Sequence, residues 1–219
     1  MTEAPGPNSR KKILEVAEAR FAQRGYAGVG LREVAEAAGL SKSSLFHHFP
    51  SKAALYCSML DGVLLRLEVR LGAALGAQHA PPARLEAGLD ELISVLAEQP
   101  TTARLLLRTL FEDDDLPEGG LPEADAMNAT LARVIGAIQS VIEAGVADDS
   151  FRPVSVPHTV QTLVGTCVYH FASGEFGDEL LGRPIFSAEA VRARREEVRA
   201  FVHFGLARQA DSAPKENAS

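Results

Sequence analysis

The side chains best suited to chemistry in this sequence lie between residues 41 and 52. They are ammonium, hydroxyl and imidazole groups, which can donate hydrogen bonds to phosphate oxygens and to the acceptor atoms of guanine. Imidazoles can also bind metal ions, but adjacent helical residues point about 100° apart and no third ligand is nearby. We therefore expect no metal site here, and we expect contacts with an anionic partner from Lys42, Ser43, Ser44, His47, His48 and Lys52.

Two short helices must position these groups. Apolar residues recur at helical spacing over residues 31–38, which predicts a helix that stops at Gly39. Ser41 is a suitable N-cap for a second helix over residues 42–48, which has few apolar residues to hold it to other elements. Two helices joined by a tight glycine-containing turn form a helix-turn-helix pattern, and the exposed face of the second helix is left for a partner.

The charge of the chain favours a nucleic acid as that partner. The formal net charge is −7, but residues 1–52 hold eight basic and five acidic residues, a local net charge of +3 that leaves −10 for the remainder. Arg10, Lys11 and Lys12 lie in the first turn of a helix predicted over residues 9–23, where the helix dipole disfavours cations. An external anion would explain that placement, although a helical hairpin that binds nothing remains the alternative at this stage.

Composition excludes several other classes of protein. With 46% hydrophobic and 23% charged residues, the 219-residue chain is typical of a globular domain with a substantial core. It lacks 18 uninterrupted apolar residues and an apolar N-terminal signal, and its two cysteines, Cys57 and Cys167, form no disulfide framework, so we expect a cytoplasmic protein with no membrane partner. No catalytic or cofactor-binding motif is present, so we expect neither an enzyme nor a cofactor.

The fold class is predicted to be all-α, with about nine helices, because helical spacing recurs along the whole chain. The pattern predicts a disordered arm over residues 1–8, a helix-turn-helix domain over 9–51, a helical body over 52–208 and a disordered tail over 209–219. Beyond the first three helices, we expect helices at 52–76, 83–98, 101–112, 123–146, 157–173 and 188–208, with an acidic exposed loop at 112–120.

The helix predicted over residues 157–173 has no clearly solvated face. One side is an apolar stripe, and the other carries small residues together with Tyr169 and few charges. Such a helix must be buried on both sides, so we expect it to pair with the helix over residues 188–208 in a four-helix interface between two copies of the chain.

Three separated motifs resemble the DNA-binding head of the TetR family of bacterial transcriptional regulators. They are Phe-Ala-x-x-Gly-Tyr from residue 21, Val-Ala-x-x-Ala-Gly-Leu-Ser-Lys from residue 34 and Leu-x-x-His-Phe-x-Ser-Lys from residue 45. The resemblance covers about residues 10–56, and beyond residue 60 only the helical outline agrees.

This resemblance implies roles for individual residues of the head. Lys42 and Ser43 would lie near bases, Arg32 would reach a base from the preceding helix, and phosphates would be contacted by Ser44, His47, His48 and Lys52. Phe46 stands where the family commonly has tyrosine, so a hydroxyl contact is replaced by an apolar one, as with a thymine methyl, or by none. Val29 and Gly30 replace the usual Thr or Ser before the second helix, which removes a side-chain cap and a phosphate contact.

The resemblance also implies a function for the body. A partly apolar small-molecule effector would bind there, shift the helix over residues 52–76 and release a homodimeric repressor from a palindromic double-stranded DNA operator. Candidates for the effector pocket are Phe111, Cys167, His170 and Phe171, although a lone His or Cys in an apolar helix is more often packed core. The rival hypothesis is a small-molecule binding or sequestering protein whose head no longer reads DNA, and an activator with the same head is a lesser variant.

Overall fold

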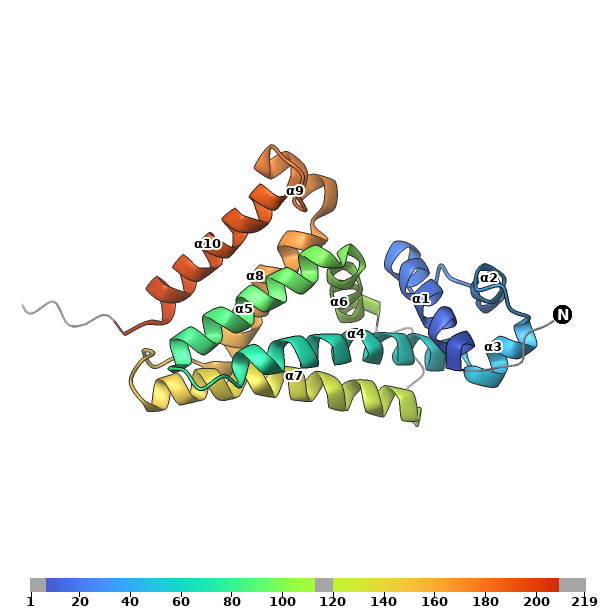
Figure 1. The fold of residues 1–219 in the computed structure, drawn as a ribbon, viewed down its shortest axis with the longest axis horizontal. Helices are drawn as coiled ribbons and strands as arrows, with labels where there is room; N and C mark the ends of the chain where they lie inside the picture. Colours follow the sequence, from blue (N-terminus) through green and yellow to red (C-terminus); the bar gives the residue numbers. More distant parts are fainter. Residues whose placement is uncertain (1–6, 113–119, 209–219) are drawn as a thin grey trace, which may run out of the picture.

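The computed structural model describes the backbone of residues 7–112 and 120–208, and the side chains of residues 8–108 and 120–208. The all-α prediction is confirmed, since the strand pairing found in these ranges is one isolated bridge between Phe151 and Ala207. The described helices, shown in Figure 1, are α1 (Pro7–Arg24), α2 (Leu31–Ala37), α3 (Lys42–His48), α4 (Lys52–Leu75), α5 (Pro81–Glu98), α6 (Pro100–Glu112), α7 (Pro122–Ala147), α8 (Val156–Ala172), α9 (Gly174–Leu181) and α10 (Ala188–Leu206).

Several helices begin earlier than predicted because proline opens them. Proline lacks an N–H group, and the first turn of a helix does not need one, so Pro81, Pro100 and Pro122 start α5, α6 and α7. In the same way α1 begins at Pro7, inside the predicted arm. The rest of that arm, the acidic loop except for its two ends, and the predicted tail lie outside the described residues.

Helix α9 is absent from the predicted set of about nine helices, whereas ten helices occur in the described ranges. Its glycines look like helix breakers in the sequence, but two of them have structural roles. Gly174 has a φ of +58°, which turns the chain from α8 into α9. Gly177 is buried, and a Cβ atom there would overlap the side chains of Ser173 and Ile185.

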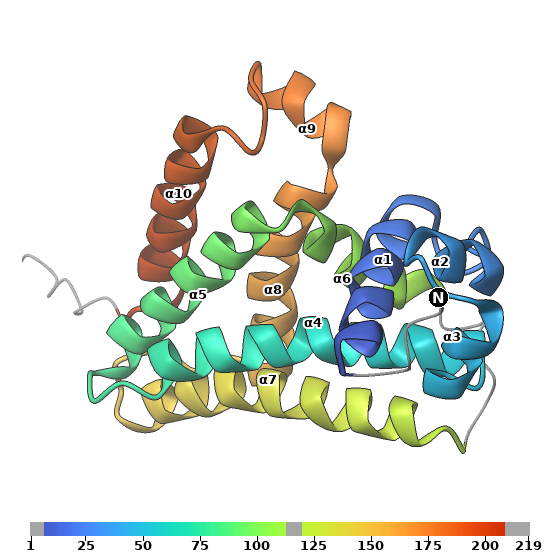
Figure 2. The same cartoon turned by 45° about the vertical axis from the view of Figure 1, so that its right-hand side comes forward.

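Helix α4 joins two hydrophobic cores. Its first half packs with α1, α2 and α3 in the head, where Tyr56 makes edge-on ring contacts with Phe21 and Tyr26 at centroid distances of 4.9 and 5.1 Å. Its second half, from Leu64 to Leu75, packs into the body core with α5, α7 and α8. Figures 1 and 2 show α4 running from the head into the body beside α7.

Helix α7 is long and apolar enough to cross a membrane by length and composition alone, and it is the one such helix in the described residues. In the structure it packs along α4 instead. Thr130 donates a 2.6 Å hydrogen bond to Asp61 of α4, and Arg133 donates to Glu68 of α4 from Nε at 2.6 Å. These polar contacts, added to the apolar ones, fix the register of α7 against α4.

Two glycines of α7 give a matched test of this packing. Gly145 faces Phe151, and an added Cβ would overlap the ring, whereas a Cβ added at Gly136 would meet no atom within 4 Å. We expect Gly145→Ala to lower the free energy of unfolding by about 1–3 kcal/mol through overpacking. We expect Gly136→Ala to raise it by up to about 1 kcal/mol through helix propensity. Urea denaturation measures both, and equal effects of the two substitutions would contradict this packing.

Candidate nucleic-acid interface

The turn between α2 and α3 has the geometry predicted for a helix-turn-helix. Gly39 adopts a φ of +71°, in the region that favours glycine. The backbone N–H of Leu40 donates to the carbonyl of Ala35 at 2.9 Å, and that of Gly39 donates to the carbonyl of Glu36 at 3.0 Å. These bonds close the end of α2 and direct the chain into α3 within a few residues.

Ser41 caps α3 as the sequence predicts. Its Oγ accepts a hydrogen bond from the backbone N–H of Ser44 at 3.1 Å. The hydroxyl oxygens of Ser43 and Ser44 also lie 2.9 Å from this Oγ, so both are within the capping network. Contacts of Ser43 with bases and of Ser44 with phosphates stay predictions. To make them, these hydroxyls would have to share their hydrogen bonds with Ser41 Oγ or give them up.

Helix α3 has one buried face and one exposed face. Leu45 and the following Phe49 are fully buried in the head core, which holds the helix in place. The exposed face carries Lys42, Ser43, Phe46 and His47. Lys42 Nζ lies 5.5 Å from the centroid of the Phe46 ring, a cation–π contact on the protein surface. An ammonium donor and an apolar ring therefore lie side by side on the face of α3 that would enter a major groove.

His48 and Lys52 occupy more constrained positions than the sequence indicates. His48 is half-buried, and its Nε2 is enclosed without a hydrogen-bond partner among the described residues. Lys52 Nζ donates to the backbone carbonyl of Ala27 at 3.3 Å and lies 4.5 Å from the Tyr26 ring centroid. Lys52 therefore joins the start of α4 to the turn between α1 and α2, and its predicted phosphate contact would be added to this structural role.

Basic residues of α1 lie against the helix-turn-helix, and Arg32 belongs to its first helix, α2. Arg10 lies over the ring of Phe49 at 5.2 Å, and Lys12 Nζ approaches Gly39 in the turn. The Phe49 ring thus provides an intramolecular contact for one cation of the first turn of α1. The exposed Arg32 donates to Glu36 at 2.8 Å, and this hydrogen bond raises the pKa of its guanidinium.

A group of ion pairs between α1 and α2 is not evident from the sequence. Glu33, in the first turn of α2, pairs with Arg24 and, at 3.2 Å, with Arg20, both from α1. The hydrogen bond from Arg24 is the main reason that the pKa of Glu33 lies below its usual value. As predicted, Gly30 caps α2 without a side-chain hydrogen bond. Because this side-chain cap is absent, the start of α2 is held on α1 by the ion pairs of Glu33.

The candidate effector residues lie together on α8, with one exception. Cys167 and Phe171 are packed in the body core, and burial raises the pKa of the Cys167 thiol to about 12. His170 is buried as well, and burial, followed by the charge of Arg194, lowers its pKa. The side chain of Phe111 lies outside the described residues. Their role in binding an effector stays a prediction.

The described residues hold no group of three or more His, Cys, Asp or Glu side chains arranged to bind a metal ion. The rings of His47 and His48 are 5.6 Å apart and are inclined at 71° to each other.

Comparison with known proteins identifies the family. A family model described as "Bacterial regulatory proteins, tetR family" matches residues 13–59, and one described as "Tetracyclin repressor-like, C-terminal domain" matches residues 81–202. Together they cover the helix-turn-helix and most of the body. The chain therefore belongs to the TetR family of bacterial regulatory proteins, and it is a DNA-binding transcriptional regulator.

Individual relatives agree with this assignment. The chain is 29% identical over 144 residues to a probable acrEF/envCD operon repressor of Escherichia coli K12, a match that covers 63% of this chain and 66% of the relative. It is 27% identical over 166 residues to the transcriptional regulator RutR of the same strain, covering 74% and 73% of the two chains. Among solved structures, AibR in complex with isovaleryl coenzyme A and operator DNA has the same fold, with a TM-score of 0.71, 16% identity and coverage of 88% of this chain and 97% of AibR.

Alanine substitutions of the two lysines predicted to bind DNA should have different effects on DNA binding. Because Lys42 lies on the exposed face of α3, Lys42→Ala should lower affinity for the preferred sequence by about 1–3 kcal/mol and relax base preference. Lys52→Ala should weaken binding to all sequences alike and reduce the salt dependence by about one phosphate contact. Arg192→Ala, an exposed cation on α10, is the matched control. Fluorescence anisotropy at several salt concentrations measures these effects, and unchanged affinity in both lysine variants would contradict the assignment.

Proposed function

We propose that this protein is a homodimeric repressor that binds a palindromic operator through α3 and releases it when a small-molecule effector binds the body. The observation that carries the proposal is the exposed face of α3, where Lys42 and Phe46 project from a helix held by Leu45 and Phe49. A single short helix reads about half a site, so specific binding requires two copies related by a two-fold axis.

The surface of α8 and α10 supports dimerisation. The small-residue face of α8 is exposed at Thr162 and Gly165, and Tyr169 on the same face is 56% exposed. Phe201 and Phe204 of α10 are also exposed. Large apolar surfaces that face water in an isolated chain mark interaction sites. The arrangement supports the predicted four-helix interface between two copies.

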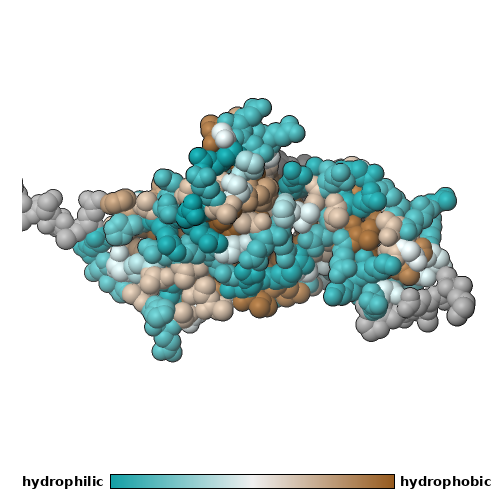
Figure 3. All heavy atoms as spheres, turned by 45° about the horizontal axis from the view of Figure 1, so that its top comes forward, coloured by the Kyte–Doolittle hydropathy of each residue, from teal (hydrophilic) through white to brown (hydrophobic). Residues whose placement is uncertain are grey.

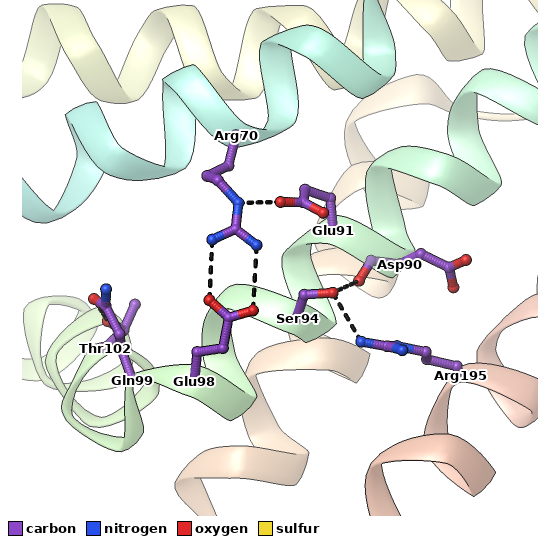
Figure 4. A network of polar contacts seen from close by, with 8 residues as sticks. All are labelled: Arg70, Asp90, Glu91, Ser94, Glu98, Gln99, Thr102 and Arg195. Carbon is purple, nitrogen blue, oxygen red and sulfur yellow. Dashed lines mark hydrogen bonds and ion pairs between the residues drawn. The ribbon is translucent and has the colours of Figure 1, made fainter. Parts of the chain in front are cut away.

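A chain of polar contacts links the dimer helix α10 to α4 through α5 (Figure 4). Arg195 of α10 donates to Ser94 Oγ of α5 at 2.8 Å. On the same face of α5 as Ser94, Glu91 and Glu98 accept hydrogen bonds from Arg70 of α4, the latter at 3.0 Å from Nη1. These hydrogen bonds raise the pKa of the Arg70 guanidinium, Glu98 contributing most. Movement of the dimer helices would therefore be transmitted to the helix that carries the head.

Helix α6 forms a second link between body and head. It packs against α8 on one side and α1 on the other, and its Leu105 is part of the head core. Glu18 of α1 accepts two hydrogen bonds from Arg66 of α4, at 2.9 and 3.0 Å, and one from Thr101 of α6 at 3.2 Å. An effector that shifted α6 or α4 would change the spacing of the two heads, with a reciprocal coupling of typically 1–3 kcal/mol.

The effector is proposed to be partly apolar, because the body core is built from aliphatic and aromatic side chains. AibR was solved with isovaleryl coenzyme A, so acyl-coenzyme A thioesters are the first compounds to test. The proposed site of action is the cytoplasm, where DNA and such metabolites coexist, and no catalytic role is proposed.

Selection of random DNA duplexes on the purified protein tests this function. We expect an inverted repeat to be enriched and bound with strong salt dependence. Binding to that sequence is then measured at fixed salt with short and long acyl-coenzyme A thioesters and with free coenzyme A as the control. Failure to enrich any sequence would contradict the operator hypothesis and favour a small-molecule binding protein whose head no longer reads DNA.

The Glu18 contacts give a test of the coupling. Glu18→Gln removes the charge that holds Arg66, so the head should occupy its DNA-binding position less of the time, and operator affinity should fall about 3–10-fold. Glu15→Gln, which removes an exposed charge paired with Lys11 at 3.9 Å, should have little effect. Operator affinity and thermal unfolding are measured for both variants. Equal operator affinities for the two variants would contradict a coupling role for Glu18.

A further inference from the structure

A cavity of about 430 Å³ lies between the end of α8, the segment that follows α9 and the first half of α10. Helix α9 joins the end of α8 to the start of α10 in Figures 1 and 2. In Figure 3 this end of the molecule projects at the top of the view, and its surface is mainly hydrophilic apart from a small apolar group. The volume is within the range of small-molecule sites in proteins, so the groups that line the cavity decide what it can hold.

His170 contributes a buried imidazole to this cavity. The residue is 9% exposed, and its Nε2 is enclosed without a hydrogen-bond partner among the described residues. Cys167 and Phe171 of the same helix are packed in the body core, whereas His170 lines the cavity. Buried polar atoms in folded proteins nearly always have a partner, so this ring nitrogen indicates that a polar group is missing.

Arg194 contributes a guanidinium whose charge has no carboxylate partner in the described part of the chain. Its Nη2 donates to the backbone carbonyl of Thr166, one helical turn before His170, and its Nε is enclosed without an acceptor. The neighbouring Arg183, which also lines the cavity, is paired with Glu189. After burial, the charge of Arg194 is the next cause that lowers the pKa of His170. A partly buried charge without a partner is unfavourable, and a bound anion would relieve this.

The other walls of the cavity indicate which class of anion fits. Leu181, Ala190 and Ala193 provide aliphatic contacts. The carboxylates of Glu189 and Glu197 also line the cavity and are exposed, so they would repel a doubly charged anion more strongly than a singly charged one. A carboxylate carries one charge and two acceptor oxygens, which match one unpaired cation and two unpartnered nitrogens.

We propose that this cavity binds a short-chain carboxylic acid in its ionised form. One oxygen would accept a hydrogen bond from Arg194 Nε and the other from the Nε2–H tautomer of His170, with the aliphatic part of the acid against Leu181 and Ala190. Because both nitrogens are enclosed, one of these two side chains must rotate slightly to admit the ligand. The site lies outside the apolar core to which the effector is assigned above, and binding there requires no DNA.

Nuclear magnetic resonance of the histidine rings tests this site directly. The chain has six histidines, and the variant His170→Gln identifies the Cε1–H signal of His170. The probes are the straight-chain acids from acetate to hexanoate, and the controls are the corresponding alcohols and inorganic phosphate at equal ionic strength. We expect a saturable shift of the His170 signal with the acids, a weaker one with phosphate and none with the alcohols. The absence of a saturable shift with every acid of the series would overturn the proposal.

A pair of α10 variants tests the role of Arg194. Arg194→Gln removes the charge and should weaken binding of the acid by at least about tenfold, since a hydrogen bond to a charged group is lost. Arg192→Gln is the matched control, because Arg192 is an exposed cation on the same helix outside the cavity, and it should bind the acid as the unmodified protein does.

Thermal unfolding gives a second measurement on the same proteins, and without acid it shows that both variants fold. A ligand that binds only the folded state raises the midpoint of unfolding, so the acid should raise it for the unmodified protein and for Arg192→Gln but not for Arg194→Gln. Equal binding of the acid by the two variants would show a general attraction of anions and would contradict the site. Neither measurement contains DNA, so the outcome is independent of the operator hypothesis.

Discussion

Helix α4 belongs to two hydrophobic cores at once, and the positions of all other elements depend on this sharing. Leu55, Tyr56 and Leu60 complete the head, whereas Leu67 and Leu71 are part of the body core. A helix that is buried at both ends cannot rotate or slide in one core without disturbing the other, because protein interiors are closely packed. The head therefore has no flexible linker to the body, and its position is set by how the body holds α4.

Polar contacts between α4 and neighbouring helices also hold the head against the body. Glu18 joins α1 to both α4 and α6, and Thr130 and Arg133 fix α7 along α4. Charged groups partly removed from water need their partners, so each of these contacts has a preferred arrangement and a cost when it is broken. The head can therefore change its position relative to the body only if some of these contacts change, and the proposed release of DNA would require such a change.

The sequence allows the head to be predicted in detail because its determinants are local. Glycine in the turn, serine at the cap of α3 and apolar residues at helical spacing all act within about ten residues, and the structure confirms α2 and α3 nearly to the residue. The exposed positions of Lys42, Ser43 and His47 follow from the same spacing. Local spacing does not reveal that Lys52 reaches back to Ala27, because that contact joins residues 25 positions apart.

The remaining features depend on contacts between distant residues. Glu18 meets Arg66 across 48 positions and Thr101 across 83, and such partners cannot be chosen from charge alone in a chain with 22 basic and 29 acidic residues. Helix α9 is not predicted for a related reason. Gly177 permits close packing on Ile185 rather than breaking the helix, and this becomes evident only when the packing partner is known.

If the body fixes the spacing of the two DNA-reading heads, the distance between the heads has a defined value in each state, and this distance can be measured. A nitroxide attached through Ala37→Cys, at an exposed position of α2, allows this distance to be measured in the dimer by pulsed electron paramagnetic resonance. Successive major grooves are about 34–36 Å apart. We expect a narrow distribution on the selected operator, and a distribution that is equally narrow but shifted once an effector releases the DNA. A distribution in the DNA-free protein as broad as expected for independently moving heads would contradict this control by the body.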